Sequence, residues 1–419
     1  MNYTFRQISQ RIRDLAVHFP VVVVTGARQV GKTTLLRHLF PDADYVVFDP
    51  SIDIENARKD PDLFLQNHAS TTLILDEIQY APEVVGAIKR AVDRHKTPGR
   101  FLLTGSQQWQ VMKKLSESLA GRAVITELDG FDLAEWRGEP STQKGWLEDW
   151  LDDPAGFAGR FQGATAPPPP LPLYEILFRG ALPEATTLPG PLLGDYHNSY
   201  LRTYVERDVR TLAGVEDLQQ FGRFHRLLAA LTAQEINHAQ LGREIGVAGK
   251  TAKAWLAILL GTFQWHEVPA YEHNLIKKVT GRPKGYFGDT GLACAAQSIP
   301  SPAALGSHPL LGALFETLVV GEIRKQALRM TSPPRLHHWR NHNQAELDLL
   351  LQYNGRLFPL EIKLSSNPSG HDTRGMTAFR KSLPDDSPPP PGLVISCSPT
   401  VRTLNAFGDF TLPWHWSST

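Results

Sequence analysis

The sequence predicts an α/β protein built from several domains, and three observations support this. Before residue 137, short apolar runs alternate with loops and helical stretches, a pattern typical of a buried parallel sheet. A glycine-rich segment, GARQVGKT at 26–33, lies between one such run and a helix. Further along the chain, two apolar-rich runs flank an Asn-Gly pair at 354–355, which is a strong signal for a tight β-hairpin.

Composition limits the class of protein. The chain has 419 residues, which suggests two to four domains at roughly 100–200 residues each. Lys plus Arg equals Asp plus Glu at 43 each, so overall charge does not by itself indicate nucleic acid. Only two cysteines occur, which favours a reducing, cytoplasmic location. The polar opening MNYTFRQISQRIRD predicts no signal peptide, and no apolar run reaches the ~18 residues of a membrane span.

Four apolar runs are expected to be the strands of the N-terminal domain. They are PVVVVTG (20–26), DYVVFD (44–49), TTLILDE (71–77) and GRFLLTGS (99–106). Runs of this length, rich in Val, Ile and Leu and bounded by turn residues, are typical of strands buried on both faces. Polar residues follow each run, at the strand ends where open α/β sheets bind their ligands.

The most specific motif follows the first of these strands. Residues 26–33 match G-x-x-x-x-G-K-[ST], the pattern of a phosphate-binding P-loop between a strand and a helix. Its backbone N–H groups would bind the phosphates of ATP, while Lys32 would reach the β- and γ-phosphates and Thr33 would ligate Mg²⁺. The predicted nucleotide-binding residues are Gly26, Ala27, Arg28, Gln29, Val30, Gly31, Lys32, Thr33, Thr34 and, from a later strand end, Ser106.

Two acids at the end of the third run supply the expected partner of the P-loop. Asp76 would hold Mg²⁺ through water, and Glu77 would orient and deprotonate the attacking water. Thr104 and Ser106 follow the next strand and could touch the γ-phosphate, although a plain Thr-Gly turn gives the same pattern. Arg122 could stabilise transition-state charge in the site of a neighbouring subunit, which would require a homo-oligomer, or it could be a surface arginine.

The middle of the chain is predicted to be helical. Residues 173–230 look mostly helical, and 231–290 look like a small helical module ending in a hairpin, with Gly246 and Gly249 flanking a turn between two helices. Trp255, Leu256 and Leu259 are expected to face inward. Basic residues that could contact DNA phosphates include Lys250, Lys253, Lys277, Lys278, Arg282 and Lys284. A packing or oligomerisation module with solvated lysines is the alternative.

The hairpin around 354–355 places charged side chains together. With these two residues as the turn, Asp348 faces Glu361 and Glu346 faces Lys363 on one side of the sheet. The opposite side is expected to carry Leu347, Leu349, Leu351, Leu360, Ile362 and Leu364. Carboxylates directly opposite each other repel, so this pairing needs an explanation.

A cation between the facing carboxylates would explain them. Asp348 and Glu361 would bind Mg²⁺ or Mn²⁺, hard ions that prefer oxygen ligands, and Glu316 on the preceding helix would be a further ligand. The ion would polarise a phosphodiester, and Lys363 would position the water or neutralise developing charge. A sheet with one solvated face is the alternative, and Pro359 indicates an edge strand or a bulge that could shift the register.

Several phrases resemble a group of prokaryotic AAA-plus-type ATPases. They are GARQVGKTT, LILDEIQ, LLTGSQ, LAGRAVITEL, FRGALPE, YVERDV, YFGDTGLA, LFETLVVGEI and LEIKLSS, and they span nearly the whole chain apart from 138–170. In that group an ATPase module is fused to a C-terminal domain of unknown function with a restriction-endonuclease-like fold. The resemblance implies a winged helix in the middle and a D…E-x-K nuclease site at Asp348, Glu361 and Lys363, with Glu-Leu in place of Pro before the aspartate.

The predicted fold class is therefore α/β: a parallel-sheet P-loop ATPase domain, a helical lid plus winged helix, and a C-terminal α/β restriction-endonuclease-like domain. The predicted boundaries are 1–137 for the ATPase core, 138–172 for an insertion or linker, 173–230 for the lid, 231–300 for the winged helix and 301–419 for the last domain. The expected function is hydrolysis of ATP, with Mg²⁺, coupled to DNA binding and metal-dependent phosphodiester cleavage. A regulatory ATPase whose C-terminal domain binds a protein or DNA without cutting is the alternative.

Overall fold

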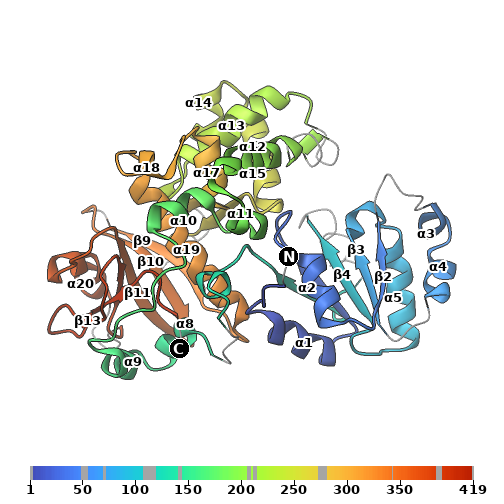
Figure 1. The fold of residues 1–419 in the computed structure, drawn as a ribbon, viewed down its shortest axis with the longest axis horizontal. Coiled ribbons are helices and arrows are strands. Elements are labelled where there is room, and N and C mark those ends of the chain that lie inside the picture. The colour runs from blue at the N-terminus through green and yellow to red at the C-terminus, as the bar shows by residue number, and fades with distance from the viewer. Residues whose placement is uncertain are drawn as a thin grey trace. The chain divides into compact units, whose positions relative to one another are not determined.

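The chain forms two compact units in the computed structural model (Figure 1). The first unit comprises residues 1–131 with the short segments 182–184 and 259–264, and the second comprises the remainder. The residues that the structure describes are 3–48, 55–68, 72–106, 119–139, 144–204, 209–210, 215–271, 281–341, 343–383 and 389–417.

A five-stranded parallel sheet forms the centre of the first unit, in the order β2-β3-β4-β1-β5. Its strands are β1 (Val21–Thr25), β2 (Asp44–Val47), β3 (Leu73–Asp76), β4 (Phe101–Gly105) and β5 (Ala123–Glu127). The first four coincide with the predicted apolar runs, and β1, β3 and β4 are buried at every position. Both edge strands are less buried: β2 has two exposed and two half-buried positions, and β5 is half-buried throughout. The expectation of burial on both faces therefore fails for the run 44–49, because an edge strand is covered on fewer sides.

Helices connect these parallel strands, as a parallel sheet requires. They are α1 (Ser9–His18), α2 (Lys32–Leu39), α3 (Glu55–Lys59), α4 (Pro61–Asn67), the 3₁₀ helix η1 (Ile78–Tyr80) and α5 (Val84–Arg94). In α5 the residues Val84, Val85, Ile88 and Val92 are buried, the spacing of an amphipathic helix that packs one face on a sheet. The chain therefore leaves β1 and β3 at the same edge of the sheet, with the P-loop after one strand and the paired acids at the end of the other.

Helices dominate the middle part of the second unit. The helices before the hairpin module are α7 (Leu133–Trp136), α10 (Leu173–Arg179), α11 (Pro183–Thr187), η2 (Gly190–Leu192) and α12 (Leu193–Thr203). The module itself runs helix, strand, helix, helix, strand, strand: α13 (Leu218–Ala230), β6 (Gln234–Glu235), α14 (His238–Ile245), α15 (Gly249–Gly261), β7 (Trp265–Val268) and β8 (Lys284–Phe287). Its three strands pair antiparallel in the order β6-β8-β7.

The turn between α14 and α15 forms as the glycines predict. Gly246 ends α14 with φ of 73°, the left-handed conformation that glycine adopts most readily. Trp255, Leu256 and Leu259 are buried, as expected, and the Trp255 ring meets Phe221 of α13 edge-on at 5.6 Å between centroids. Lys277 and Lys278, named above among the basic residues, lie outside the described residues.

The segment predicted as an insertion or linker contains two helices, α8 (Trp146–Asp152) and α9 (Pro154–Phe161). Trp150 is fully buried and packs edge-on against Phe358, with 5.6 Å between ring centroids. Phe157, also fully buried, lies 6.0 Å from the ring of Phe410. The segment therefore contributes aromatic side chains to the core against the C-terminal sheet.

That sheet has six strands in the order β13-β14-β12-β11-β10-β9. The strands are β9 (Arg335–Arg340), β10 (Glu346–Tyr353), β11 (Arg356–Lys363), β12 (Leu393–Ser396), β13 (Arg402–Thr403) and β14 (Phe410–Pro413). The helices that pack on these strands include α19 (Leu311–Arg329), η4 (Gly370–Thr373) and α20 (Arg374–Arg380). In the middle part, α17 (Thr290–Ala296) packs on α10, α12 and α13, and α18 (Pro302–Leu305) packs on α10. The predicted hairpin register is confirmed, because Leu349 pairs with Leu360 and Tyr353 pairs with Arg356.

Two details of this hairpin differ from the prediction. First, β11 is an interior strand, and Pro359 pairs in regular register with Leu350, since pairing with β12 begins only at the next residue, Leu360. Second, the pairing of β10 with β9 shifts register between Leu347 and Leu350, the mark of a β-bulge. Leu347 consequently packs in the same core cluster as Leu350, which shares the face of Asp348, and not on the opposite face.

Candidate functional site

The glycine-rich loop adopts backbone conformations that its glycines make accessible. Gly26 has φ of 149°, and a Cβ at that position would lie 2.0 Å from the carbonyl oxygen of Leu128. Gly31 has φ of 92° and directly precedes α2. Gly26 is therefore needed because a side chain has no room there and because of its backbone conformation. Gly31 is needed for its left-handed backbone.

Arg6 holds this loop in place, and the sequence analysis missed it. Its guanidinium donates to the carbonyl of Val30 at 2.7 Å and to the carbonyls of Asp129 and Gly130 at 2.7 and 3.1 Å. With five N–H donors in a planar fork, one buried arginine can tie the loop to the segment after β5. These contacts join residues far apart in the sequence, so no local pattern could have indicated them.

The predicted phosphate and metal residues lie together at the start of α2. The Lys32 ammonium donates to the carbonyls of Gly26 and Ala27 at 3.0 and 2.7 Å, within the loop itself. The Thr33 hydroxyl lies 2.9 and 2.8 Å from the two carboxylate oxygens of Asp76. Hydroxyl and carboxylate oxygens are hard ligands of the kind that Mg²⁺ prefers, so these residues fit the ion that a P-loop site implies.

Two further hydroxyls orient the Asp76 carboxylate, which is buried at the end of β3. Tyr45 donates to it at 2.8 Å, and Thr104 donates to its other oxygen. Thr104 also accepts the N–H of Glu77 at 3.1 Å. Burial, together with the hydrogen bond to Asp76, raises the pKa of Tyr45 and keeps it a donor. Thr104 therefore aligns both acids of the site.

Glu77, the expected base, is held by a residue that the sequence analysis did not identify. Glu77 has φ of 56°, an uncommon left-handed conformation for a residue other than glycine. The amide nitrogen of buried Gln79 contacts the Glu77 carboxylate and lies 3.1 Å from the Ser106 hydroxyl. A carboxylate only accepts hydrogen bonds, so the nitrogen of the amide must face Glu77. The amide oxygen has no partner within the described part of the chain.

Replacing Gln79 with alanine tests this link. We expect ATP turnover to fall by about 10-fold or more, because the Glu77 carboxylate loses the donor that orients it, while the affinity for ATP changes little. Steady-state kinetics would measure ATP turnover, and a direct nucleotide-binding measurement would give the affinity for ATP separately. In a Glu77→Gln background the same substitution should have almost no further effect; an additive loss, or weakened binding alone, would show that Gln79 acts elsewhere.

Arg122 lies away from this site. Its guanidinium contacts Asp93 and the carbonyl of Ala120, the latter at 3.2 Å. Arg122 precedes β5, whose first residue pairs with Val21 at the start of β1, whereas the P-loop follows the other end of β1. Four residue steps of about 3.3 Å separate the two ends. Arg122 therefore lies too far from the P-loop of its own chain to act there. Its role in stabilising the transition state stays a prediction for the site of a neighbouring subunit.

The predicted C-terminal site residues come from one helix and two strands. Glu316 lies on α19, Asp348 on β10, and Glu361 and Lys363 on β11. The Lys363 ammonium lies 2.7 Å from the Glu361 carboxylate and 3.3 Å from that of Asp348, and the N–H of Ile362 donates to Asp348 at 2.8 Å. The three carboxylates, buried or half-buried, offer the hard oxygen ligands that Mg²⁺ and Mn²⁺ prefer, although among the described residues their ligand atoms do not all lie within 4.8 Å of one another.

Two side chains from β8, Lys284 and Tyr286, also reach these carboxylates. We call Glu316, Asp348, Glu361, Lys363 and Lys284 the carboxylate cluster. The Lys284 ammonium lies 2.6 Å from Glu316 and 3.3 Å from Asp348, with only 11% of its side chain exposed. The Tyr286 hydroxyl donates to Glu316 at 2.8 Å. Lys284 is therefore not the solvated, phosphate-contacting lysine that the sequence analysis considered, because antiparallel pairing carries β8 into the second unit's interior.

Burial and mutual repulsion dominate the electrostatics of the cluster. Burial disfavours the charge of Asp348, yet Lys284 and Lys363 hold its pKa below the ordinary value. Burial, and then the charge of Asp348, raises the pKa of Glu361 well above its usual range and that of Glu316 to about 7. Asp348 is thus the carboxylate that stays ionised, while its two neighbours gain protons more easily.

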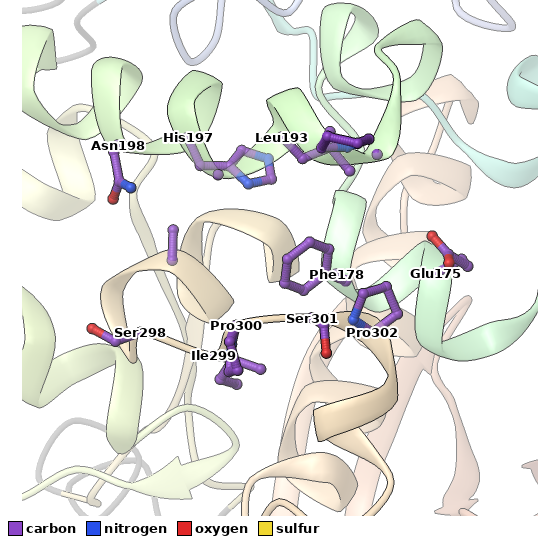
Figure 2. A pocket seen from close by; sticks show the side chains of 14 residues that line it. Glu175, Phe178, Leu193, His197, Asn198, Ser298, Ile299, Pro300, Ser301 and Pro302 are labelled. Atoms are coloured by element: carbon purple, nitrogen blue, oxygen red, sulfur yellow. The ribbon is translucent and has the colours of Figure 1, made fainter.

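A separate pocket of about 540 Å³ lies among the helices of the middle part (Figure 2). Leu193, His197 and Asn198 of α12 line one side, and residues 298–302 line another. The His197 imidazole bonds the carbonyl of Arg179 at 3.1 Å, and burial lowers its pKa. The pocket includes none of the predicted site residues.

Three family models match separate stretches of the chain. A model described as "AAA domain" matches residues 18–136, so this part has the fold of an AAA-type P-loop ATPase domain. Residues 172–303 and 311–415 match two domains of unknown function, DUF8612 and DUF4143. The division of the chain into five parts stays a prediction.

The chain also resembles two curated proteins and several solved structures. It is 29% identical over 364 residues to the uncharacterized proteins Rv2008c of Mycobacterium tuberculosis and Mb2031c of Mycobacterium bovis, covering 87% of this chain and 75% of each relative. The Walker-type ATPase PABY2304 of Pyrococcus abyssi aligns with 14% identity and a TM-score of 0.42, over 70% of this chain and 95% of that one. RuvB of Thermotoga maritima aligns with 15% identity and a TM-score of 0.30, over 66% and 93%. Because both TM-scores are low, the assignment of residues 18–136 rests on the family model. Across the described ranges, no helix has both the length and the apolar character needed to cross a bilayer.

Proposed function

We propose that the protein binds and hydrolyses MgATP at the carboxyl edge of the first sheet. The observation that carries this proposal is the contact of Thr33 with Asp76 at 2.9 and 2.8 Å, beside a loop whose two glycines have positive φ. Two separate segments, 26–33 and 76–77, thereby supply a phosphate loop, a pair of magnesium ligands and a base. The match of residues 18–136 to the AAA domain supports the same conclusion.

Each residue of this site has a definite role in the proposed reaction. The loop N–H groups and Lys32, released from its carbonyl partners, would bind the phosphates, and Thr33 with Asp76 would hold the metal. Bound Mg²⁺ would neutralise charge that develops on the phosphate oxygens. Glu77 would take the proton of the attacking water. Thr104 would hold the backbone of Glu77 in place, and Gln79 would hold its carboxylate.

Substitution of Lys32 tests nucleotide binding directly. Lys32→Ala should weaken MgATP binding by at least about 10-fold, since it removes a charged hydrogen bond worth roughly 1.5–3 kcal/mol. Isothermal titration calorimetry with a non-hydrolysable ATP analogue measures this, and Lys59→Ala, which removes an exposed lysine of α3, is the matched control. Equal affinities in all three proteins would mean that the triphosphate binds elsewhere.

We further propose that nucleotide state controls a nucleic-acid-processing part formed by the middle module and the C-terminal sheet. The module's order of helix, strand, two helices and two strands supports a winged helix, a common DNA-binding form. Glu316, Asp348, Glu361 and Lys363 lie together at the C-terminal sheet, which supports a metal-dependent phosphodiesterase of restriction-endonuclease type. A divalent ion held there would polarise the phosphodiester, and Lys363 would stabilise the developing charge.

One observation favours a second function, a regulatory ATPase whose C-terminal part binds without cutting. Each of the three carboxylates is already paired with an ammonium of the same chain, so the carboxylate cluster can also serve as an internal scaffold. A screen of supercoiled DNA with Mg²⁺ and Mn²⁺, with and without ATP, separates the two functions. Nicking favours the phosphodiesterase, and ATP turnover without any nicking favours the regulatory switch.

A further inference from the structure

We propose that Lys284 closes the C-terminal carboxylate cluster, so that a divalent cation enters only when β8 withdraws this lysine. The inference rests on the proposed metal-dependent function of the cluster and adds its regulation. Lys284 belongs to the middle module, whereas the three carboxylates belong to α19 and the six-stranded sheet. The closing group is therefore supplied by a different part of the chain from the site that it closes.

Geometry places the Lys284 ammonium where a cation would bind. It lies 2.6 Å from Glu316 and 3.3 Å from Asp348, bridging the helix carboxylate to the strand carboxylate. A divalent ion bound to the same two carboxylates would lie within about 4 Å of the ammonium, and like charges at that separation repel strongly in a buried site. Ion and lysine thus exclude each other, and occupancy of the cluster becomes a competition between them.

The two lysines of the cluster differ in how they can leave. Lys363 is 35% exposed in its side chain and lies on β11 between its carboxylate partners, so it can turn toward solvent without moving the sheet. Lys284 is 11% exposed, and its strand pairs with both β6 and β7. Removing the Lys284 ammonium by more than a rotamer change therefore requires movement of β8.

Other contacts hold β8 against the cluster and must be broken when the strand withdraws. Tyr286, two residues after Lys284, also donates to Glu316 at 2.8 Å, so withdrawal of β8 removes two donors from one carboxylate. Withdrawal must also break the 2.9 Å bond between His338 of β9 and the carbonyl of Arg282, because this bond ties the segment before β8 to the sheet that carries Asp348. The position of the middle module relative to this sheet is thereby linked to whether Glu316 and Asp348 are free for a cation.

Titration of the nucleotide-free 419-residue chain with Mn²⁺, followed by calorimetry, tests the proposal. Lys284→Met should bind Mn²⁺ at least about 10-fold more tightly than the natural protein, because the competing charge is gone while a side chain of similar length remains. Lys325→Met is the matched control: Lys325 is a buried lysine paired with Glu322 on α19, outside the cluster. This control should leave Mn²⁺ affinity unchanged.

A second variant tests whether the ion binds at the carboxylate cluster. A second measurement, made on the natural protein, keeps the test valid if a variant misfolds. Adding Asp348→Asn to Lys284→Met should abolish the gain in affinity. In the natural protein, saturating Mn²⁺ should accelerate hydrogen exchange at the β8 amides, because binding displaces that strand. Unchanged affinity in Lys284→Met, a gain that survives Asp348→Asn, or Mn²⁺ binding with β8 protection intact would each overturn the proposal.

These outcomes are distinct from failure of the proposed cleavage function. A tighter Mn²⁺ site in Lys284→Met without any DNA nicking would support Lys284 as the closing group and remove the phosphodiesterase. Nicking by the natural protein, together with a Mn²⁺ affinity that Lys284→Met does not change, would support the phosphodiesterase and overturn the closing role of Lys284.

Discussion

Glu77→Gln should lower ATP turnover by about 100-fold or more while MgATP still binds, since general-base catalysis contributes roughly 10²–10⁴-fold. The amide cannot accept the proton of the attacking water, but it keeps the size of the side chain, and the left-handed backbone at residue 77, just before η1, is unchanged. Phosphate release measures turnover, and calorimetry measures binding. The expected result is a protein that holds ATP for long periods without cleaving it.

The control for this variant is Glu83→Gln, an exposed glutamate six residues further along the same segment. It should hydrolyse ATP at the natural rate. Turnover by Glu77→Gln within about 3-fold of the natural rate would show that another group activates the water, and the roles given to Gln79 and Thr104 would fail with it.

Loss of metal-dependent DNA nicking is the expected result of Asp348→Ala. Asp348 contacts both lysines of the cluster and accepts the N–H of Ile362, and it is the carboxylate whose pKa is held below its ordinary value. Its removal takes away the ligand that stays charged, and single catalytic groups of this kind contribute several kcal/mol of transition-state stabilisation. Nicking should fall below detection while ATP turnover is retained.

Glu346→Gln is the matched control, because Glu346 lies two residues earlier on β10 and is exposed. It should nick DNA like the natural protein. Lys363→Ala is expected to behave like Asp348→Ala. If both cluster variants cut DNA normally, the carboxylate cluster is not a phosphodiesterase site, and any nicking activity arises elsewhere in the chain.

The sequence was sufficient where function depends on neighbours along the chain. The P-loop could be identified because its glycines, Lys32 and Thr33 are consecutive and their backbone conformations follow from local sterics. The hairpin register followed from the 354–355 turn, because a two-residue loop fixes which residues face each other. The strands β1, β3 and β4 were evident because strands buried at every position read as continuous apolar runs.

Only the tertiary structure decided which distant residues share a site. Arg6 and Lys284 have no motif of their own, and the phrase LILDEIQ, which ends at Gln79, does not show that Gln79 reaches Ser106. A buried hydrogen bond or ion pair depends on three-dimensional approach and not on spacing in the sequence. Local pattern could also not show that the insertion helices pack on the C-terminal sheet, since Trp150 and Phe157 are buried against strands more than 200 residues later in the chain. The sequence by itself determined the chemistry that each segment carries. Packing determined that Lys284 of the middle module lies among the carboxylates of the last sheet. The physical reason is that a desolvated charge is stable only beside a charge of opposite sign.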